Sequence, residues 1–173
     1  GPMDYTPGIF VQDLASVTEG RNNSWVNATI ANQLALYVTL YSPRQMAADL
    51  PEHYAKFMDA FQFIKDVDID WIQSKYLLAE PGEYVVIARQ GKKEGQWFCG
   101  GVTDDQKRTV DVPLQFLDPE KTYEATIYRD ADDAHYKENP QAYVIEKKTV
   151  TFHDFLPVTM APGGGFAISF EEK

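Results

Sequence analysis

The sequence has a single cysteine and few basic residues. Cys99 stands alone, which excludes an internal disulfide framework and leaves the redox compartment open. It lies in QWFCGGV with no positive charge nearby, so we expect a buried strand thiol rather than a nucleophile. The 16 lysines and arginines stand against 26 aspartates and glutamates, a net charge of −10. This balance argues against nucleic acid or an anionic membrane surface as the main partner.

Long hydrophobic runs are missing as well. No apolar stretch approaches the roughly 18 residues of a membrane span, so we predict no membrane insertion. The first ten residues, GPMDYTPGIF, lack the basic region and short apolar stretch of an export signal. Residues Gly1–Met3 match what a cleaved affinity tag followed by an initiator methionine leaves behind, and the sequence does not decide whether they are native.

Several catalytic signatures are absent. There is no G-x-S-x-G elbow of a serine hydrolase, and the three histidines lie in unrelated polar stretches without the helical spacing of a zinc site. We therefore expect His53, His135 and His153 to lie at the surface. The glycines at 163–165 lack the lysine and the helix that follow a phosphate-binding loop, so they indicate a hairpin turn.

Two acidic stretches are candidates for a cation site. Asp66, Asp68 and Asp70 share one face if the chain is extended there, but their mutual repulsion favours a solvated linker over a metal site. Asp130 and Asp132 match the first and third positions of an EF-hand loop. The later positions lack the required oxygen ligand, glycine and glutamate, so we expect a long polar hairpin loop instead.

Two further patterns concern sugars. The sequons at Asn22 and Asn27 match glycosylation acceptors, and we treat both as chance because one lies in a predicted helix. Planar rings that bind sugars are supplied by Trp25, Trp71 and Trp97 if they are exposed. Because Trp97 stands beside Phe in a strand-like stretch, burial in the core is the favoured interpretation, and sugar binding remains the alternative.

The part of the chain before residue 67 is predicted to be helical and loop-like. Apolar residues at spacings of three and four predict a helix over 26–41, capped by Ser24 or Asn27 and ended by Pro43. The apolar face takes up most of the circumference, so this helix is covered on more than one side. Two short helical turns follow, one of them with Pro51 in its first turn.

From about residue 68 the periodicity changes to two. About eight short segments rich in β-branched and aromatic residues are separated by glycine and proline turns, with no crossover helices between them. This order predicts an antiparallel β-sandwich. In YEATIYR, the inward set Tyr123, Ala125 and Ile127 alternates with an outward set of Glu124, Thr126 and Tyr128.

The chain resembles glycoside hydrolase family 97 over its whole length. The resemblance lies in GPMDYTPGIF, ANQLALYVTLYSPRQMAADLPEHY, EPGEYVVIARQ, WFCGGVTDDQKRTVDVPLQFL, YEATIYRDADDAHY and MAPGGGFAISF, in this order and spacing. It implies the last part of an α-glucosidase or α-galactosidase built from an N-terminal β-supersandwich, a catalytic (β/α)8 barrel and a C-terminal β-domain. Residues 1–67 would then be the last strand and helix of the barrel, and residues 68–173 the C-terminal antiparallel β-sandwich domain.

This resemblance also implies where the chemistry lies. Glycoside cleavage needs two carboxylates across the scissile bond. The catalytic carboxylates and the calcium ligands of the family fall in earlier segments, so none is carried over to this chain, which is expected to be inactive alone. Asp4 and Tyr5 would lie at the mouth of the barrel, as neighbours of the substrate.

The expected partners follow from the same resemblance. They are the upstream barrel and N-terminal domain, further copies of the protein in a homo-oligomer, and an oligosaccharide bound by the parent enzyme, which would be periplasmic or secreted. A non-catalytic carbohydrate-binding β-sandwich is the alternative. Residues 1–66 carry an apolar surface that must be covered, so we expect them to pack on the sandwich, to pair with another copy, or to contact an upstream polypeptide.

Overall fold

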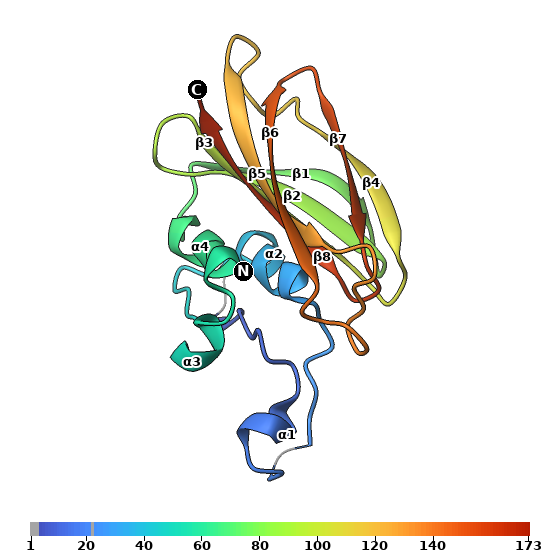
Figure 1. Cartoon of the computed structure of the whole chain (residues 1–173). Helices are drawn as coiled ribbons and strands as arrows, with labels where there is room; N and C mark the ends of the chain where they lie inside the picture. The colour runs from blue at the N-terminus through green and yellow to red at the C-terminus, as the bar shows by residue number, and fades with distance from the viewer. Residues whose placement is uncertain (1–3, 22) are drawn as a thin grey trace.

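The computed structural model describes residues 4–21 and 23–173, which form three layers (Figure 1). Gly1–Met3 and the sequon residue Asn22 lie outside the described residues. Helices come first along the chain, and they pack on one face of a large sheet whose other face is covered by a smaller sheet. The helices are α1 Leu14–Val17, α2 Ile30–Thr39, α3 Pro51–Tyr54 and α4 Met58–Asp66.

The predicted antiparallel β-sandwich is confirmed. Among the described residues, eight strands form a six-stranded sheet in the order β1-β2-β3-β8-β5-β6 and a two-stranded sheet of β4 and β7, and these strands pair antiparallel to one another. The turn at 162–164 joins β7 to β8 and so crosses between the sheets, which corrects the predicted hairpin. The strands are β1 Gln73–Glu80, β2 Tyr84–Gln90, β3 Gln96–Thr103, β4 Arg108–Pro113, β5 Thr122–Asp130, β6 Tyr143–Thr151, β7 Phe155–Met160 and β8 Gly165–Glu172.

Helix α2 is shorter than predicted at both ends. Asp13 and Trp25 form an antiparallel bridge, and the N–H of Val26 donates to the carbonyl of Gln12, so residues 25 and 26 are extended and the helix cannot begin there. Its cap is Thr29, whose hydroxyl accepts from the N–H of Asn32, not Ser24 or Asn27. At the other end the backbone becomes extended at Leu40, before Pro43 is reached.

Two of the short helices, α3 and α4, confirm the prediction, and a third, α1, is additional. Helices α3 and α4 are the two predicted turns, and Pro51 occupies the first turn of α3. Helix α1 was not predicted. Its signal is Asp13, whose carboxylate accepts from the N–H of Ala15 two residues later, which is the arrangement of an N-cap.

The six-stranded sheet has a hydrophobic core on each face. Between the two sheets lie Trp97, Cys99, the predicted inward set of β5 and apolar residues of β4, β7 and β8. Burial raises the pKa of the Cys99 thiol, which confirms a buried structural cysteine. The second core lies between the helices and the sheet and is made by Phe10, Ile30, Leu34, Tyr37, Val38, Tyr54, Ala60, Phe63, Val67, Phe98, Tyr128 and Ala167.

One assignment on β5 is wrong for a physical reason. Alternation along β5 predicts that Tyr128 faces outward, but it is buried, because α4 covers that face of the sheet. The ring of Phe63 from α4 packs edge to face against Tyr128, with centroids 5.4 Å apart, and against Phe98, at 6.1 Å. The helical segment therefore packs on the sandwich, one of the three expected ways of covering its apolar surface.

Helix α2 approaches the sheet closely where β3 and β8 carry glycines. A Cβ atom at Gly100 would lie 2.8 Å from the carbonyl oxygen of Ala35 and 2.9 Å from Cβ of Val38. A Cβ atom at Gly165 would lie 3.0 Å from Cα of Asn32. These residues let the helix backbone rest directly on the strands. Within residues 4–21 and 23–173, none of the helices is long and apolar enough to cross a membrane.

Candidate functional site

The two residues predicted to border a substrate site begin the described chain. Asp4 is exposed, whereas Tyr5 is half-buried and pairs with Gln45 in an isolated parallel bridge. Burial raises the pKa of Tyr5. Residues 6–12 continue without helix or strand, so side chains from elsewhere must hold this N-terminal segment in place. Their role beside a substrate stays a prediction.

Helix α2 supplies the first of these contacts through Gln33. The side-chain oxygen of Gln33 accepts from the backbone N–H of Gly8 at 3.0 Å and of Ile9 at 3.1 Å. Gly8 has a φ of +96°, and a Cβ atom there would lie 2.6 Å from the hydroxyl of Tyr37. Only glycine fits this position without strain, so the path of the segment is fixed by its sequence as well as by its partners.

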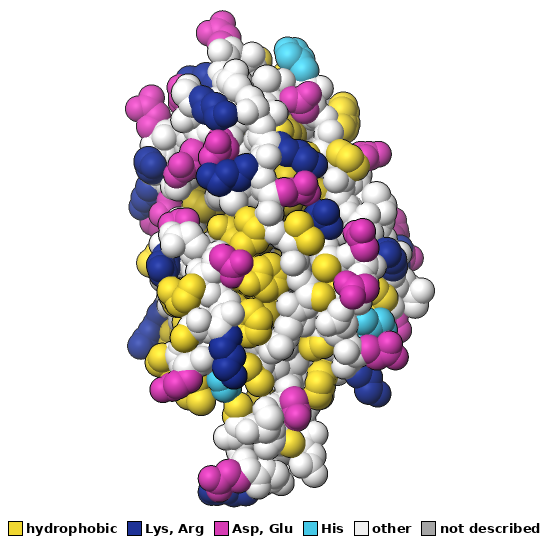
Figure 2. All heavy atoms as spheres, in the orientation of Figure 1, with side chains coloured by type: hydrophobic (Ala, Val, Ile, Leu, Met, Phe, Trp, Pro, Cys, Tyr) yellow, Lys and Arg dark blue, Asp and Glu magenta, His cyan; other side chains and the backbone are white. Residues whose placement is uncertain are grey.

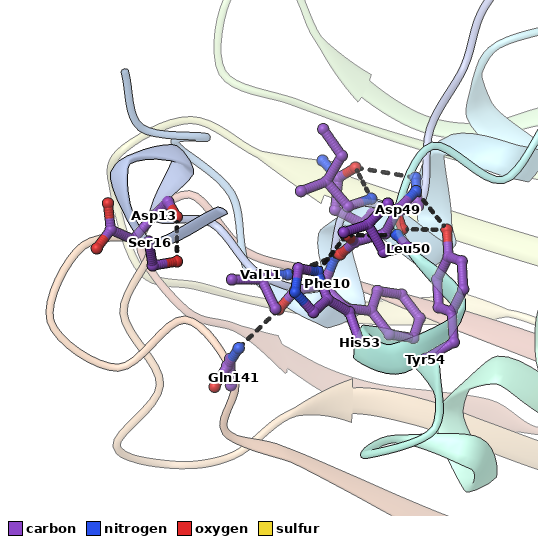
Figure 3. A network of polar contacts seen from close by, with 12 residues as sticks. Phe10, Val11, Asp13, Ser16, Asp49, Leu50, His53, Tyr54 and Gln141 are labelled. Carbon is purple, nitrogen blue, oxygen red and sulfur yellow. Dashed lines mark hydrogen bonds and ion pairs between the residues drawn. The ribbon is translucent and has the colours of Figure 1, made fainter. Parts of the chain in front are cut away.

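Asp49 supplies the second set of contacts (Figure 3). One carboxylate oxygen accepts from the N–H of Phe10 at 2.7 Å and of Val11 at 2.9 Å, and the other accepts from the N–H of Leu50 at 2.8 Å. That second oxygen also pairs with Nδ1 of His53. Burial raises the pKa of Asp49, but the hydrogen bonds from His53 and the backbone outweigh it and hold the pKa below its usual value.

Two tyrosines complete the network. The hydroxyl of Tyr54 donates to the carbonyl of Gly8 at 2.6 Å and accepts from the N–H of Asp49. The hydroxyl of Tyr37 lies 2.9 Å from the carbonyl of Met46 and 3.1 Å from that of Pro7, and burial raises the pKa of both tyrosines. The N-terminal segment is thus held by the side-chain amide of Gln33, by uncharged hydroxyls and by one carboxylate.

This network positions the chain and has little capacity for chemistry. An aspartate that orients a histidine is typical of a general base, and the pair of Asp49 and His53 has that form. Both oxygens of Asp49, however, already accept two bonds each from neighbouring groups. The expectation that His53 lies at the surface is wrong, since it is mostly buried beside Asp49.

The other two histidines are not part of this network. His153 is exposed in the turn between β6 and β7, as expected. His135 is half-buried in the loop between β5 and β6, where its ring stacks on Tyr136 and its Nδ1 accepts from the N–H of Lys137.

The first acidic stretch has a structural partner. The carboxylate of Asp68 accepts from the N–H of Lys92 at 2.7 Å, and Asp70 forms an ion pair with the ammonium of Lys92. The stretch therefore fastens the β2–β3 turn to the end of α4. Among the residues that the structure describes, no group of three or more His, Cys, Asp or Glu side chains is placed to hold a metal ion. Within that part of the chain, the carboxylates of Asp68 and Asp70 are engaged by Lys92 and form no oxygen cage of the kind that binds calcium.

Asp130 is the most unusual acidic residue of the chain. The polar loop begins only after it, and its carboxylate is buried at the end of β5, where one oxygen accepts from the N–H of Ala161 and of Gly165 at 2.8 Å each. The other oxygen has no well-formed hydrogen bond. Burial raises the pKa of Asp130 to about 6, although Thr29 and the two N–H groups oppose this. Asp130 thus pins the β7–β8 turn to β5.

The three tryptophans differ in burial, and the second sequon lies just before α2. Trp97 is buried between the sheets, which confirms the core interpretation, and Trp71 packs against Phe98 at 5.7 Å between ring centroids. Trp25 is partly exposed, but its indole N–H donates to the carbonyl of Tyr136. Asn27 is exposed and precedes α2, so the argument that its sequon lies in a helix was wrong.

One hollow on the helical face of the sheet contains two glutamates. It has a volume of about 200 Å3 and is lined in part by Glu124, Glu171 and Lys147. The two glutamates are register partners on β5 and β8, so they stand side by side on adjacent strands and do not face each other across a cleft. The ion pair with Lys147 lowers the pKa of Glu124, whereas a glycosidase acid needs a raised one. The hollow does not have the form of a glycosidase site.

Comparison with known proteins gives a consistent set of matches. Residues 70–171 match the family described as "Glycosyl-hydrolase 97 C-terminal, oligomerisation". The chain is 34% identical to a retaining alpha-galactosidase of Bacteroides thetaiotaomicron over 99% of its own length, and 31% identical to a probable retaining alpha-galactosidase of Streptomyces bingchenggensis over 96%. It covers 25% and 23% of these proteins, so it spans about a quarter of the length of the curated relatives it matches.

A solved structure matches the whole chain. It is a glycoside hydrolase family 97 enzyme from Pseudoalteromonas sp. strain K8 in complex with panose, which superimposes with a TM-score of 0.92 at 47% identity. The match covers 100% of this chain and 27% of that enzyme. The helical segment and the sandwich thus occur together, in this arrangement, in a much longer protein.

Proposed function

The chain belongs to glycoside hydrolase family 97, and from this membership we propose that it is the C-terminal portion of an α-glycosidase that acts on oligosaccharides. The observation that carries the proposal is the match of the whole chain to about a quarter of a family 97 enzyme. The relatives named as retaining alpha-galactosidases and the structure with panose support α-galactosides or α-glucosides as the substrate class.

The proposed parent enzyme divides its tasks between segments. Residues 1–67 supply the closing strand and helix of the catalytic barrel, with Asp4 and Tyr5 near its mouth. The reactive carboxylates and a calcium ion belong to segments that precede this chain in the parent, which is exported to the periplasm or secreted. The tight hydrogen bonding of the N-terminal segment by Gln33 and Asp49 supports a positioning role for this part.

We propose that the β-domain stabilises the barrel and joins subunits, without chemistry of its own. The family description for residues 70–171 names oligomerisation, and the polar groups of the chain support the absence of chemistry. Asp49 is saturated by its partners, Asp130 is buried in a turn, and Glu124 is held ionised by Lys147. None of these carboxyls is both accessible and poised to give up a proton near neutral pH.

Two measurements on the purified 173-residue chain test this proposal. Assays with nitrophenyl α-glucoside and α-galactoside are expected to give no hydrolysis above a mock preparation. Sedimentation equilibrium is expected to give a mass that rises with concentration toward a multiple of the 19.6 kDa monomer. Turnover by the pure chain contradicts the absence of chemistry. A mass that stays at the monomer value up to about 100 μM means a Kd of self-association weaker than ~10−4 M, and contradicts the subunit-joining role.

A carbohydrate-binding role is the second candidate, and its support is weaker. Binding modules hold sugars on exposed aromatic faces. Trp97 is buried and Trp71 is half-buried against the core between helices and sheet, whereas Trp25 is partly exposed, with its indole N–H bonded to the carbonyl of Tyr136. Isothermal titration with malto-oligosaccharides and galactosides decides between the two. Measurable heat at millimolar ligand favours the binding module, and its absence favours the subunit-joining role.

A further inference from the structure

Four exposed hydrophobic side chains gather at one edge of the six-stranded sheet. We call them the β1 patch: Tyr76 is 74% exposed, Ile72 60%, and Leu40 and Tyr41 37% each. Ile72 and Tyr76 lie at and within edge strand β1, and Leu40 and Tyr41 follow the last turn of α2. Figure 2 shows one face of the molecule, on which other exposed hydrophobic side chains near the middle are surrounded by charged ones.

Arg89 of β2 ties the parts of the patch together. Its guanidinium donates to the carbonyl of Val38 at the end of α2 and to the hydroxyl of Ser74, which lies between Ile72 and Tyr76 on β1. The ring of Tyr41 lies 5.8 Å from the same guanidinium. The patch is therefore built on a strand and a helix end that are already fixed, so little conformational entropy remains to be lost when a partner binds.

The charges around the patch allow a second copy to approach. Arg89 is buried and hydrogen-bonded, and Asp70 beside Ile72 is paired with Lys92, so the patch itself presents no unpaired charge. This matters because the chain carries a net charge of −10 and repels copies of itself elsewhere. The acidic residues at the β1–β2 turn are Glu80 and Glu83, and Glu83 is paired with Arg108; both lie at the opposite end of the strand from Ile72.

An antiparallel arrangement about a two-fold axis near Tyr76 uses this layout. It places the acidic turn of one copy beside the Ile72 end of the other copy, and so keeps the two acidic turns apart. Tyr76 then lies near the axis, where it contacts its own equivalent, as an isologous interface requires. Tyrosine at the centre of an apolar patch is typical of residues that dominate binding energy.

The exposed area is adequate for the centre of such an interface. With up to ~200 Å2 per aromatic side chain, the patch exposes on the order of 400 Å2. A standard interface buries roughly 800 Å2 on each partner, with an apolar centre and a polar rim. The patch therefore supplies about half of one side, and charged residues around it supply the rim.

We propose that the β1 patch is the surface through which two copies of this chain associate. The proposal rests on the proposed function, because residues 70–171, which include Ile72 and Tyr76, match a family described by oligomerisation. It goes further by naming the contact surface and its symmetry. The competing occupant of the patch is the polypeptide that precedes this chain in its longer relatives.

The first test compares two lysine substitutions by sedimentation equilibrium. Tyr76→Lys places a charge in the patch, and Phe155→Lys places one at a matched position, 61% exposed on β7 of the two-stranded sheet. Both side chains are exposed, so neither change buries a charge, and circular dichroism checks that both variants are folded. We expect Tyr76→Lys to weaken association at least tenfold and Phe155→Lys to leave it within twofold of the wild type.

The outcomes separate the two proposals. A wild-type chain that stays monomeric overturns the proposed subunit-joining function. A wild-type chain that associates, with a Tyr76→Lys variant that associates equally well, overturns the β1 patch alone and leaves the patch to the preceding polypeptide. Loss of association in Phe155→Lys but not in Tyr76→Lys moves the interface to the two-stranded sheet and also refutes the inference.

Cysteine cross-linking gives an independent readout of the symmetry. The natural Cys99 is buried and its thiol pKa is raised, so a cysteine introduced at the surface is the reactive one. Under mild oxidation, Tyr76→Cys is expected to form a disulfide-linked dimer at protein concentrations where Phe155→Cys does not. Equal cross-linking of the two variants contradicts a two-fold axis near Tyr76.

Discussion

Replacement of Asp130 by asparagine should remove a defined part of the pH dependence of stability. The buried carboxyl of Asp130 has its pKa raised from 3.8 to about 6. A folded-state pKa above the unfolded value means that the native protein holds this proton more tightly, so ionisation destabilises the fold. The free energy of unfolding does not change with pH through this group below about pH 4. It falls as the pH rises from 4 to 6 and stays at the lower level above 6.

The size of this effect follows from the shift. A difference of about 2 pKa units corresponds to ~3 kcal/mol at 1.36 kcal/mol per unit. Asparagine keeps one oxygen that accepts from the N–H groups of Ala161 and Gly165, but it does not titrate. The stability of Asp130→Asn relative to the wild type should therefore improve by up to ~3 kcal/mol between pH 4 and pH 6.

Urea unfolding at half-unit steps from pH 3.5 to 7.5 measures this difference. Subtracting the two curves cancels the other titrating groups that both proteins share, including Glu146, whose pKa is lowered by the hydrogen bond from Arg129. A constant offset added to the pH-dependent rise is compatible with the reasoning, because the amide nitrogen of asparagine then occupies the site of the carboxylate oxygen that has no hydrogen-bond partner. A difference that is flat across the whole pH range would refute it.

Two further substitutions test the packing of the helical segment. Gly100→Ala should destabilise the chain by ~1 to 3 kcal/mol in urea unfolding, because the new Cβ meets the carbonyl of Ala35 and Cβ of Val38. An unchanged midpoint would show that α2 does not rest on β3 as described. Asp49→Ala should cost ~2 to 3 kcal/mol, because it leaves the N–H groups of Phe10, Val11 and Leu50 without their acceptor. Limited proteolysis should then cut within residues 4–13 faster than in the wild type, and equal cutting rates would contradict the proposed anchoring.

The strands were predictable because their signals are local. Alternation along YEATIYR placed Tyr123, Ala125 and Ile127 correctly, and the glycine and proline turns marked the strand ends. The same pattern assigns Tyr128 to the wrong environment. Its burial depends on α4, which lies about sixty residues earlier in the sequence and covers a face that alternation alone marks as solvated.

The polar contacts were not predictable, because their partners are remote in sequence. The acidic stretch around Asp130 predicts a residue of a polar loop. Its hydrogen-bond donors, Ala161 and Gly165, are 31 and 35 positions away. Asp49 likewise bonds Phe10, 39 positions earlier. The start of α2 also depends on a distant contact, the bridge from Trp25 to Asp13. Propensity describes single segments and carries no information about such pairs.

A chimeric enzyme tests the central claim most directly. In the retaining alpha-galactosidase of Bacteroides thetaiotaomicron, the region matched by this chain, about a quarter of that protein, is replaced by residues 4–173. The account predicts a soluble chimera that hydrolyses nitrophenyl α-galactoside within about tenfold of the parent, while the truncated protein without this region is inactive or insoluble. A truncated protein as active as the parent, or a soluble and folded chimera without activity, would contradict the claim that this chain completes a family 97 glycosidase.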